Sequence, residues 1–336
     1  MSDPTGGAVE EALADARRKY RNWGRWGPDD ALGTLNYIDD AKRGAAAALA
    51  RTGRAFSLAV ELGRTGPGSG HRGSGNPVHT MLDSGVEGVA GVEGVAGVAG
   101  IAGAQGYPHG FGDVDDVVFM PLRSGTHWDG LGHVFDNALA WNGRHRAEVL
   151  TAAGDRVTGA ERQAARFVSR GVLLDVGRVV GGSSLPDGHA ITEDELQATI
   201  HAQGPSARVA RGDIVLVRTG QLARCRGTGD WAGYASGPAP GLSFASLAWL
   251  HGSEIAAVAT DTFAVEVRPH EFDAPCVSPL HQIAIPNIGL FLGEMFDTDA
   301  LAADCAADGV YEFLLVAAGL PIVGGVGLPA NPIAIK

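Results

Sequence analysis

The chain reads Met120-Pro121-Leu122-Arg123-Ser124-Gly125-Thr126-His127-Trp128-Asp129-Gly130-Leu131-Gly132-His133 at the end of an apolar run, which places two imidazoles and a carboxylate within seven residues. His127 and Asp129 are two residues apart, so in extended chain both side chains point the same way and can reach one cation. An imidazole and a carboxylate together suit Zn²⁺ or Mn²⁺. His133 follows two glycines and can serve as a further ligand or as a general base. The same spacing also fits a polar network without a metal.

Short apolar runs alternate with helical stretches through the rest of the chain. Strands are predicted at 117–122, 172–176, 214–217, 255–259, 288–292 and 311–316. A helix is expected to begin after Thr192, whose hydroxyl caps it while Glu195 completes a capping box. Further helices are expected at 243–251 and 298–307. This alternation predicts an α/β fold with a mixed sheet flanked by helices.

The N-terminal part has a different character. Residues 1–54 are expected to form a helical extension, with helices at 10–23 and 39–51, and residues 55–336 one α/β domain that opens with a strand at 56–62. Asp39 is a candidate cap for the second helix. From Gly85 to Gly103 glycine recurs at every third position in a Gly-Val-x repeat. Residues 85–105 are interpreted as a flexible insertion, with a mobile lid over a site as the alternative.

The composition narrows the class of function. Lys and Arg number 26 against 38 Asp and Glu, a net charge of −12, so a nucleic-acid partner is not expected. The three cysteines contain no CxxC pair, which argues against a disulfide framework and favours a reducing compartment. No run predicts a membrane span or a secretory leader. We expect a cytoplasmic protein that acts on a small molecule, without a membrane or nucleic-acid partner.

Several motifs resemble those of one family. Gly125-Thr126-His127-x-Asp129-x-x-x-His133 is similar to the core of the HxGTHxDxxxH motif of the cyclase family, whose members include bacterial kynurenine formamidases and isatin hydrolases. Residues 212–220 resemble the family's GD-apolar-RTG strand, and residues 259–262 its D-T turn. His281 and Glu294 resemble the C-terminal His and Glu of the family. The long N-terminal part is similar to that of a larger subfamily of cyclases whose chemistry is poorly defined.

The resemblance implies a swivelling β/β/α fold, a divalent metal, Zn²⁺ or Mn²⁺, that activates water, and a homodimer or homotetramer. Carried over by position, it makes His127 and Asp129 metal ligands and His133 the general acid/base. His281 and Glu294 become further ligands or partners of the ligands, and Glu294 is also placed among the catalytic residues. A bound cation lowers the pKa of water toward about 7, so a nearby imidazole can handle its proton.

Arg123 is a departure from the family motif. It stands where the first motif histidine is expected, and a guanidinium cannot bind a metal. Three outcomes are open. A single metal survives on the other ligands; Arg123 turns away or anchors a carboxylate or oxyanion; or the site has lost its metal and works by acid/base chemistry alone.

Other candidate residues have weaker support. His79 is a candidate for the substrate pocket, with a surface role as the alternative. Trp26 and Trp128 are candidates for an aromatic substrate wall, with core packing as the alternative. Asp261 is a candidate for orienting a ligand histidine, with a turn cap as the alternative. The charged cluster at 267–271 is interpreted as solvated in preference to a site for an acidic group.

Three functions remain open at this point. The first is a metal-dependent hydrolase that opens a cyclic amide, a lactone or an aryl formamide. The second is a secondary-metabolite cyclase or dehydratase of the polyketide type, which uses the same acid/base residues for enolisation and ring closure. The third, motivated by Arg123, is a non-catalytic binder of small molecules.

Overall fold

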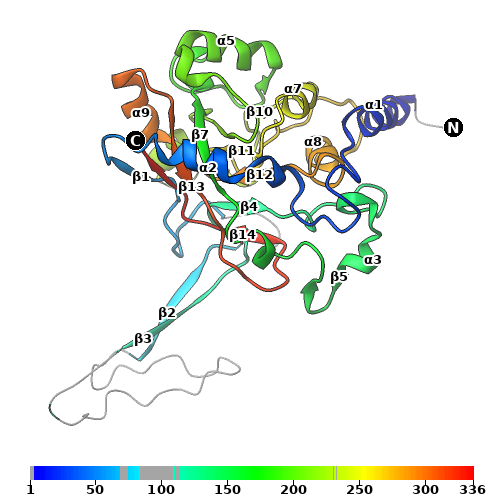
Figure 1. Cartoon of the computed structure of the whole chain (residues 1–336), viewed down its shortest axis with the longest axis horizontal. Helices are drawn as coiled ribbons and strands as arrows, with labels where there is room; N and C mark the ends of the chain where they lie inside the picture. Colours follow the sequence, from blue (N-terminus) through cyan, green and yellow to red (C-terminus); the bar gives the residue numbers. More distant parts are fainter. Residues whose placement is uncertain (1–3, 69–74, 84–108, 110–113, 230, 232) are drawn as a thin grey trace.

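The structure is a computed structural model that describes residues 4–68, 75–83, 109, 114–229, 231 and 233–336. Within these residues, nine strands pair into one sheet in the order β1-β15-β13-β7-β9-β11-β12-β4-β14 (Figure 1). The strands are β1 (Ala55–Ser57), β4 (His127–Asp129), β7 (Val168–Leu174), β9 (Ile214–Val217), β11 (Ala257–Thr260), β12 (Phe291–Glu294), β13 (Glu312–Val316), β14 (Gly327–Pro329) and β15 (Ile333–Ile335).

The centre of the sheet is parallel and buried. Strand β9 pairs in parallel with β7 and β11, and β11 pairs in parallel with β12. All four residues of β9 are buried, as expected for a strand that other elements cover on both faces. Antiparallel strands flank this centre, with β13 beside β7 and β4 beside β12. The predicted mixed α/β sheet is confirmed.

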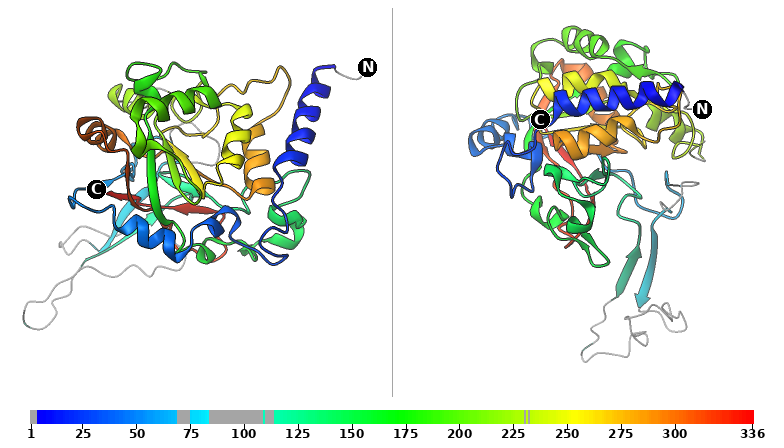
Figure 2. Two further views of the ribbon diagram at one scale, coloured as in Figure 1. Left: turned by 45° about the horizontal axis from the view of Figure 1, so that its top comes forward. Right: turned by 90° about the vertical axis from the view of Figure 1, so that its right-hand side faces the viewer.

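Helices cover the sheet, and two of them begin where the sequence predicts. Thr192 and Glu195 form the capping box of α5, and Asp39 accepts a hydrogen bond from the Lys42 amide at the start of α2. Helices α1, α7 and α8 lie side by side (Figure 2), whereas α2 packs against β7 and β13. The helices are α1 (Pro4–Tyr20), α2 (Asp40–Ala47), α3 (Arg146–Val149), α4 (Val176–Val179), α5 (Glu193–Gln203), α6 (Gln221–Gly227), α7 (Leu247–Gly252), α8 (Pro279–Ile283) and α9 (Asp299–Asp308). No helix in the described part of the chain has the length and apolar character needed to span a bilayer.

The N-terminal segment packs into the same hydrophobic core as the sheet. Leu13 of α1 is buried within that core. The Trp23 indole donates a hydrogen bond to the Pro286 carbonyl at 2.6 Å, and Lys42 forms an ion pair with Asp213 at 2.5 Å. The part of residues 1–54 that the structure describes is therefore joined to the α/β domain through buried contacts.

The predicted strand at 117–122 lies outside the main sheet. Strand β3 (Asp115–Phe119) pairs antiparallel with β2 (Val78–Asp83), and this ribbon projects from the body of the protein (Figure 1). A buried strand is expected there, but four of the five β3 residues are exposed, because the motif enters the main sheet only at β4. The Gly-Val-x repeat predicted at 85–105 falls outside the described residues. The remaining pairs are β8 (Ala190–Ile191) with β10 (Gly241–Leu242) and β5 (Leu150–Thr151) with β6 (Gly154–Asp155).

Candidate metal centre

The pairing of β4 with β12 brings three candidate ligands together. Glu294 lies directly opposite His127 in the antiparallel ladder, and Asp129 follows His127 by two residues on the same face. Strand β14 pairs with the other edge of β4. The three side chains are therefore enclosed, with exposed fractions of 0% for His127, 1% for Asp129 and 4% for Glu294.

The ligand atoms of these residues converge on one point. His127 Nε2 lies 3.5 Å from Asp129 Oδ1 and 3.5 Å from Glu294 Oε2, and the three ligand atoms lie within 4.8 Å of one another. His127 Nδ1 is 2.8 Å from the Gly125 carbonyl oxygen. In the neutral ring this nitrogen therefore carries the proton and Nε2 is left as the ligand atom.

The donor set fits a divalent metal ion. Among the described residues, His127 Nε2 and both carboxylate oxygens of Asp129 are buried without a hydrogen-bond partner. Buried polar atoms in proteins are normally paired, and an ion among these atoms would satisfy all of them. Three protein ligands, with a further position left for water, are also the number found in catalytic zinc sites.

His281 of α8 faces the same cluster with its Nε2 atom, and Glu266 contacts the opposite ring nitrogen. Its Nε2 lies 3.4 Å from Glu294 Oε1 and 3.7 Å from Asp129 Oδ2. Its Nδ1 forms a short hydrogen bond with Glu266, which also accepts hydrogen bonds from the Leu280 and His281 amides. Burial lowers the pKa of His281, but Glu266 and Glu294 outweigh burial and raise it to about 10.

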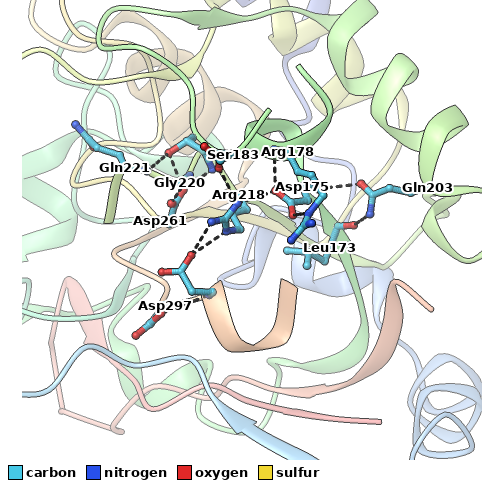
Figure 3. Close-up of polar contacts among 12 residues, drawn as sticks. Leu173, Asp175, Arg178, Ser183, Gln203, Arg218, Gly220, Gln221, Asp261 and Asp297 are labelled. Carbon is cyan, nitrogen blue, oxygen red and sulfur yellow. Dashed lines mark hydrogen bonds and ion pairs between the residues drawn. The ribbon is translucent and has the colours of Figure 1, made fainter. Parts of the chain in front are cut away.

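Glu266 takes the role that the sequence analysis gave to Asp261. Asp261 instead accepts hydrogen bonds from the Thr219 amide and hydroxyl and from the Gly220 amide, at 2.6, 2.8 and 2.8 Å (Figure 3). These contacts fix the turn after β9 to the end of β11, and burial raises the pKa of Asp261. Glu266 was missed because it lies 15 residues before His281, a spacing that matches no motif.

A cavity of about 740 Å³ reaches the cluster. Asp129, Glu294 and His281 line it together with His133. His133 Nε2 lies 3.7 Å from Asp129 Oδ1, and burial, aided by the charge of Arg123, lowers the pKa of His133 despite the opposing effect of Asp129. His133 is therefore neutral near pH 7 and able to accept a proton.

Comparison with known proteins shows the family to which the chain belongs. The family model described as "Putative cyclase" matches residues 57–267. A crystal structure of a novel cyclase shares 34% sequence identity and a TM-score of 0.81, over 95% of this chain and 99% of that chain. The chain belongs to the cyclase family.

More distant structures share the cyclase fold. Isatin hydrolase A from Ralstonia solanacearum is 18% identical with a TM-score of 0.59, over 88% of this chain and 97% of that chain. An isatin hydrolase bound to the product analogue thioisatinate is 15% identical with a TM-score of 0.58, over 89% and 99%. No curated protein matches the sequence significantly.

Arg123, the departure from the cyclase motif, lies in the wall of the cavity. The cluster of His127, Asp129 and Glu294 forms without it. Arg268 of the cluster at 267–271 lines the same cavity and is only partly exposed, so the interpretation of this arginine as solvated is wrong.

Three other candidates lie away from the cavity. Trp128 is 0% exposed, stacks on Phe167 with ring centres 4.8 Å apart, and donates its indole hydrogen to the Ala317 carbonyl. Trp26 packs edge-on against Tyr37. The exposed His79 ring forms a hydrogen bond with the Asp116 carboxylate across the β2–β3 ribbon, with Nε2 and Oδ2 2.7 Å apart. The two tryptophans therefore pack against other aromatic side chains, and His79 links the two strands of the ribbon.

Proposed function

We propose that this member of the cyclase family is a metal-dependent hydrolase that opens a cyclic amide, a lactone or an aryl formamide. The observation that carries the proposal is the buried cluster of His127, Asp129 and Glu294 beside a large cavity, in which the ligand atoms of His127 and Asp129 have no hydrogen-bond partner. Buried polar groups without partners are costly to keep in a folded protein. Their presence at the end of a cavity supports a site that is completed by an ion.

The residues divide into ligands and their supports. His127, Asp129 and Glu294 would hold the divalent ion, zinc or manganese. When bound there, such an ion polarises a carbonyl and lowers the pKa of water. His281, fixed by Glu266, is the further candidate ligand, since its Nε2 faces both carboxylates.

His133 is the candidate general acid/base. Its lowered pKa leaves it neutral, so it can accept a proton from water while the water oxygen forms a bond to the carbonyl carbon. It then returns the proton to the leaving nitrogen or oxygen as the ring or formamide bond breaks. Asp129, 3.7 Å away, stabilises the charged imidazole between these two events.

A second candidate function is ring closure or dehydration by the same acid/base residue. The cationic Arg123 in the cavity wall favours it, because a guanidinium can stabilise an enolate without a metal. Hydrolysis in ¹⁸O-labelled water incorporates the label into the product, whereas cyclisation does not. Retention of every activity by His133→Ala would instead favour a non-catalytic binder.

The first experiment measures metal per chain in protein purified without chelator, for the wild type and for His127→Ala. His201→Ala is the matched control, because His201 is exposed on α5. We expect about one divalent ion per chain, lost only in His127→Ala. Loaded protein is then assayed on isatin, formanilides and aryl lactones. A wild type that binds no divalent ion under any loading condition would refute the metal-dependent hydrolase.

A further inference from the structure

Two arginines line the cavity beside the metal cluster, and neither has a carboxylate partner in the part of the chain that the structure describes. Arg123 makes no hydrogen bond or ion pair there at all. Arg268 donates hydrogen bonds to the carbonyls of Ala235 and Tyr234, at 2.8 and 2.7 Å, and its buried Nε has no partner. Partly buried cations in proteins are normally paired.

The acidic groups of the same cavity already have partners. The two negative charges of Asp129 and Glu294 match a divalent ion in the proposed cluster. Glu10, which also lines the cavity, pairs with Arg17 at 2.6 Å. With these charges balanced, the positive charge of the two cavity arginines remains for a ligand to neutralise.

We propose that the substrate carries a carboxylate and that Arg123 binds this group. Arg123 offers five N–H donors in a rigid fork that matches the two oxygens of a carboxylate. Arg268 is fixed by its carbonyl partners and adds positive potential to the same cavity. As a statement about substrate, the proposal rests on the proposed function, because it places the anion and the bond to be broken in one molecule.

The rest of the cavity wall defines the body of such a substrate. Its apolar side chains include Val9, Leu13, Phe135, Phe263, Pro275 and Val277. A wall of this kind favours an apolar ring or chain, while a few polar groups fix its orientation. The structure therefore assigns the cavity to small aromatic or alicyclic acids.

The test measures binding, so it does not depend on turnover. The fluorescent acid 2-aminobenzoate and its neutral analogue 2-aminobenzamide are titrated into wild type, Arg123→Met and Arg162→Met. Arg162 is the matched control, because its side chain is 52% exposed and lies outside the cavity. We expect wild type and Arg162→Met to bind the acid at least about 10-fold more tightly than the amide, and Arg123→Met to lose this preference.

Arg123→Lys keeps the positive charge without the fork, and we expect it to retain an intermediate preference. If Arg123→Met does not fold, the acid preference of Arg123→Lys tests the proposal in its place. Equal affinity of the wild type for both probes, no binding of the acid, or full preference in the folded Arg123 variants would overturn the proposal. A clear preference in a protein that hydrolyses nothing would refute the proposed function and leave the Arg123 site standing.

Discussion

Glu294 and His127 face each other across the β12–β4 ladder, with Oε2 and Nε2 3.5 Å apart. The pairing of β12 with β4 alone therefore sets the geometry of the cluster of His127, Asp129 and Glu294. Asp129 lies on the same face as His127 because of the pleat of β4. These three candidate ligands are thus held by strands of the sheet and not by loops, which favours accurate positioning.

Replacing Glu294 with Gln keeps the shape of the side chain and removes a ligand charge. We expect the affinity for Zn²⁺ or Mn²⁺ to fall by at least about 10- to 100-fold, as measured by competition with a chelating dye. Glu254→Gln is the control, since Glu254 forms ion pairs with Arg25 and Arg211 at the surface. Unchanged affinity in Glu294→Gln would remove Glu294 from the ligand set.

Replacing Glu266 with Gln should loosen His281 without touching the cluster directly. Partners of metal-site histidines typically change affinity or activity by about 10- to 100-fold. Because Glu266 raises the pKa of His281, the variant should also lower that pKa, which NMR titration of the metal-free protein can follow. A lower activity with an unmoved His281 titration would point to a merely structural effect.

Metal binding should release protons. The pKa of His281 is raised to about 10, so its ring is charged at pH 7 in the metal-free protein and must lose its proton to act as a ligand. We expect about one proton per ion and an affinity that rises with pH through the neutral range. Calorimetry in two buffers of different ionisation enthalpy measures this release, and identical heats in both would contradict it.

Stability should depend on Asp136 at neutral pH. Arg17 pairs with this carboxylate at 2.7 Å, and Gln282 and Asn287 also donate to it. Burial raises the pKa of Asp136, but these partners outweigh burial and lower it. The stabilisation is therefore present above the unfolded pKa of about 3.9 and lost as pH falls through the folded value.

The variant for this prediction is Asp136→Asn. It should lower the free energy of unfolding at pH 7 by about 2 kcal/mol, because it removes the charge that Arg17, Gln282 and Asn287 contact and leaves Arg17 paired only with the exposed Glu10. Urea titrations at pH 7 and at successively lower pH should show the difference shrinking. Asp15→Asn, which removes an exposed pair on α1, should change little, and an equal loss in both variants would argue against a special role for Asp136.

The parts of the fold that depend on local chemistry could be predicted from the sequence. The apolar run at 214–217 became β9 with the expected bounds, because a short run of branched apolar residues fits a strand covered on both faces. The capping box at Thr192 formed for an equally local reason. The spacing of His127 and Asp129 placed both on one face, as the pleat requires.

The remaining features depend on contacts between distant segments. Trp128 points into the core because both faces of β4 are buried. The motif alone does not reveal that the face opposite His127 and Asp129 is buried as well. Glu266 reaches His281 only through the packing of α8 against the segment that follows β11. Arg268 is held in the cavity wall by hydrogen bonds to the carbonyls of Tyr234 and Ala235, which are more than 30 residues away in the sequence.

Helix α1 contributes Val9 and Leu13 to the cavity, whereas the cluster lies on strands of the central sheet. The shape of the cavity and the chemistry at its end are therefore encoded in separate stretches of sequence. Substitutions along one face of the first helix can therefore change the shape of the cavity while His127, Asp129 and Glu294 stay in register. That separation would allow the accepted molecule to change while the residues of the cluster stay the same.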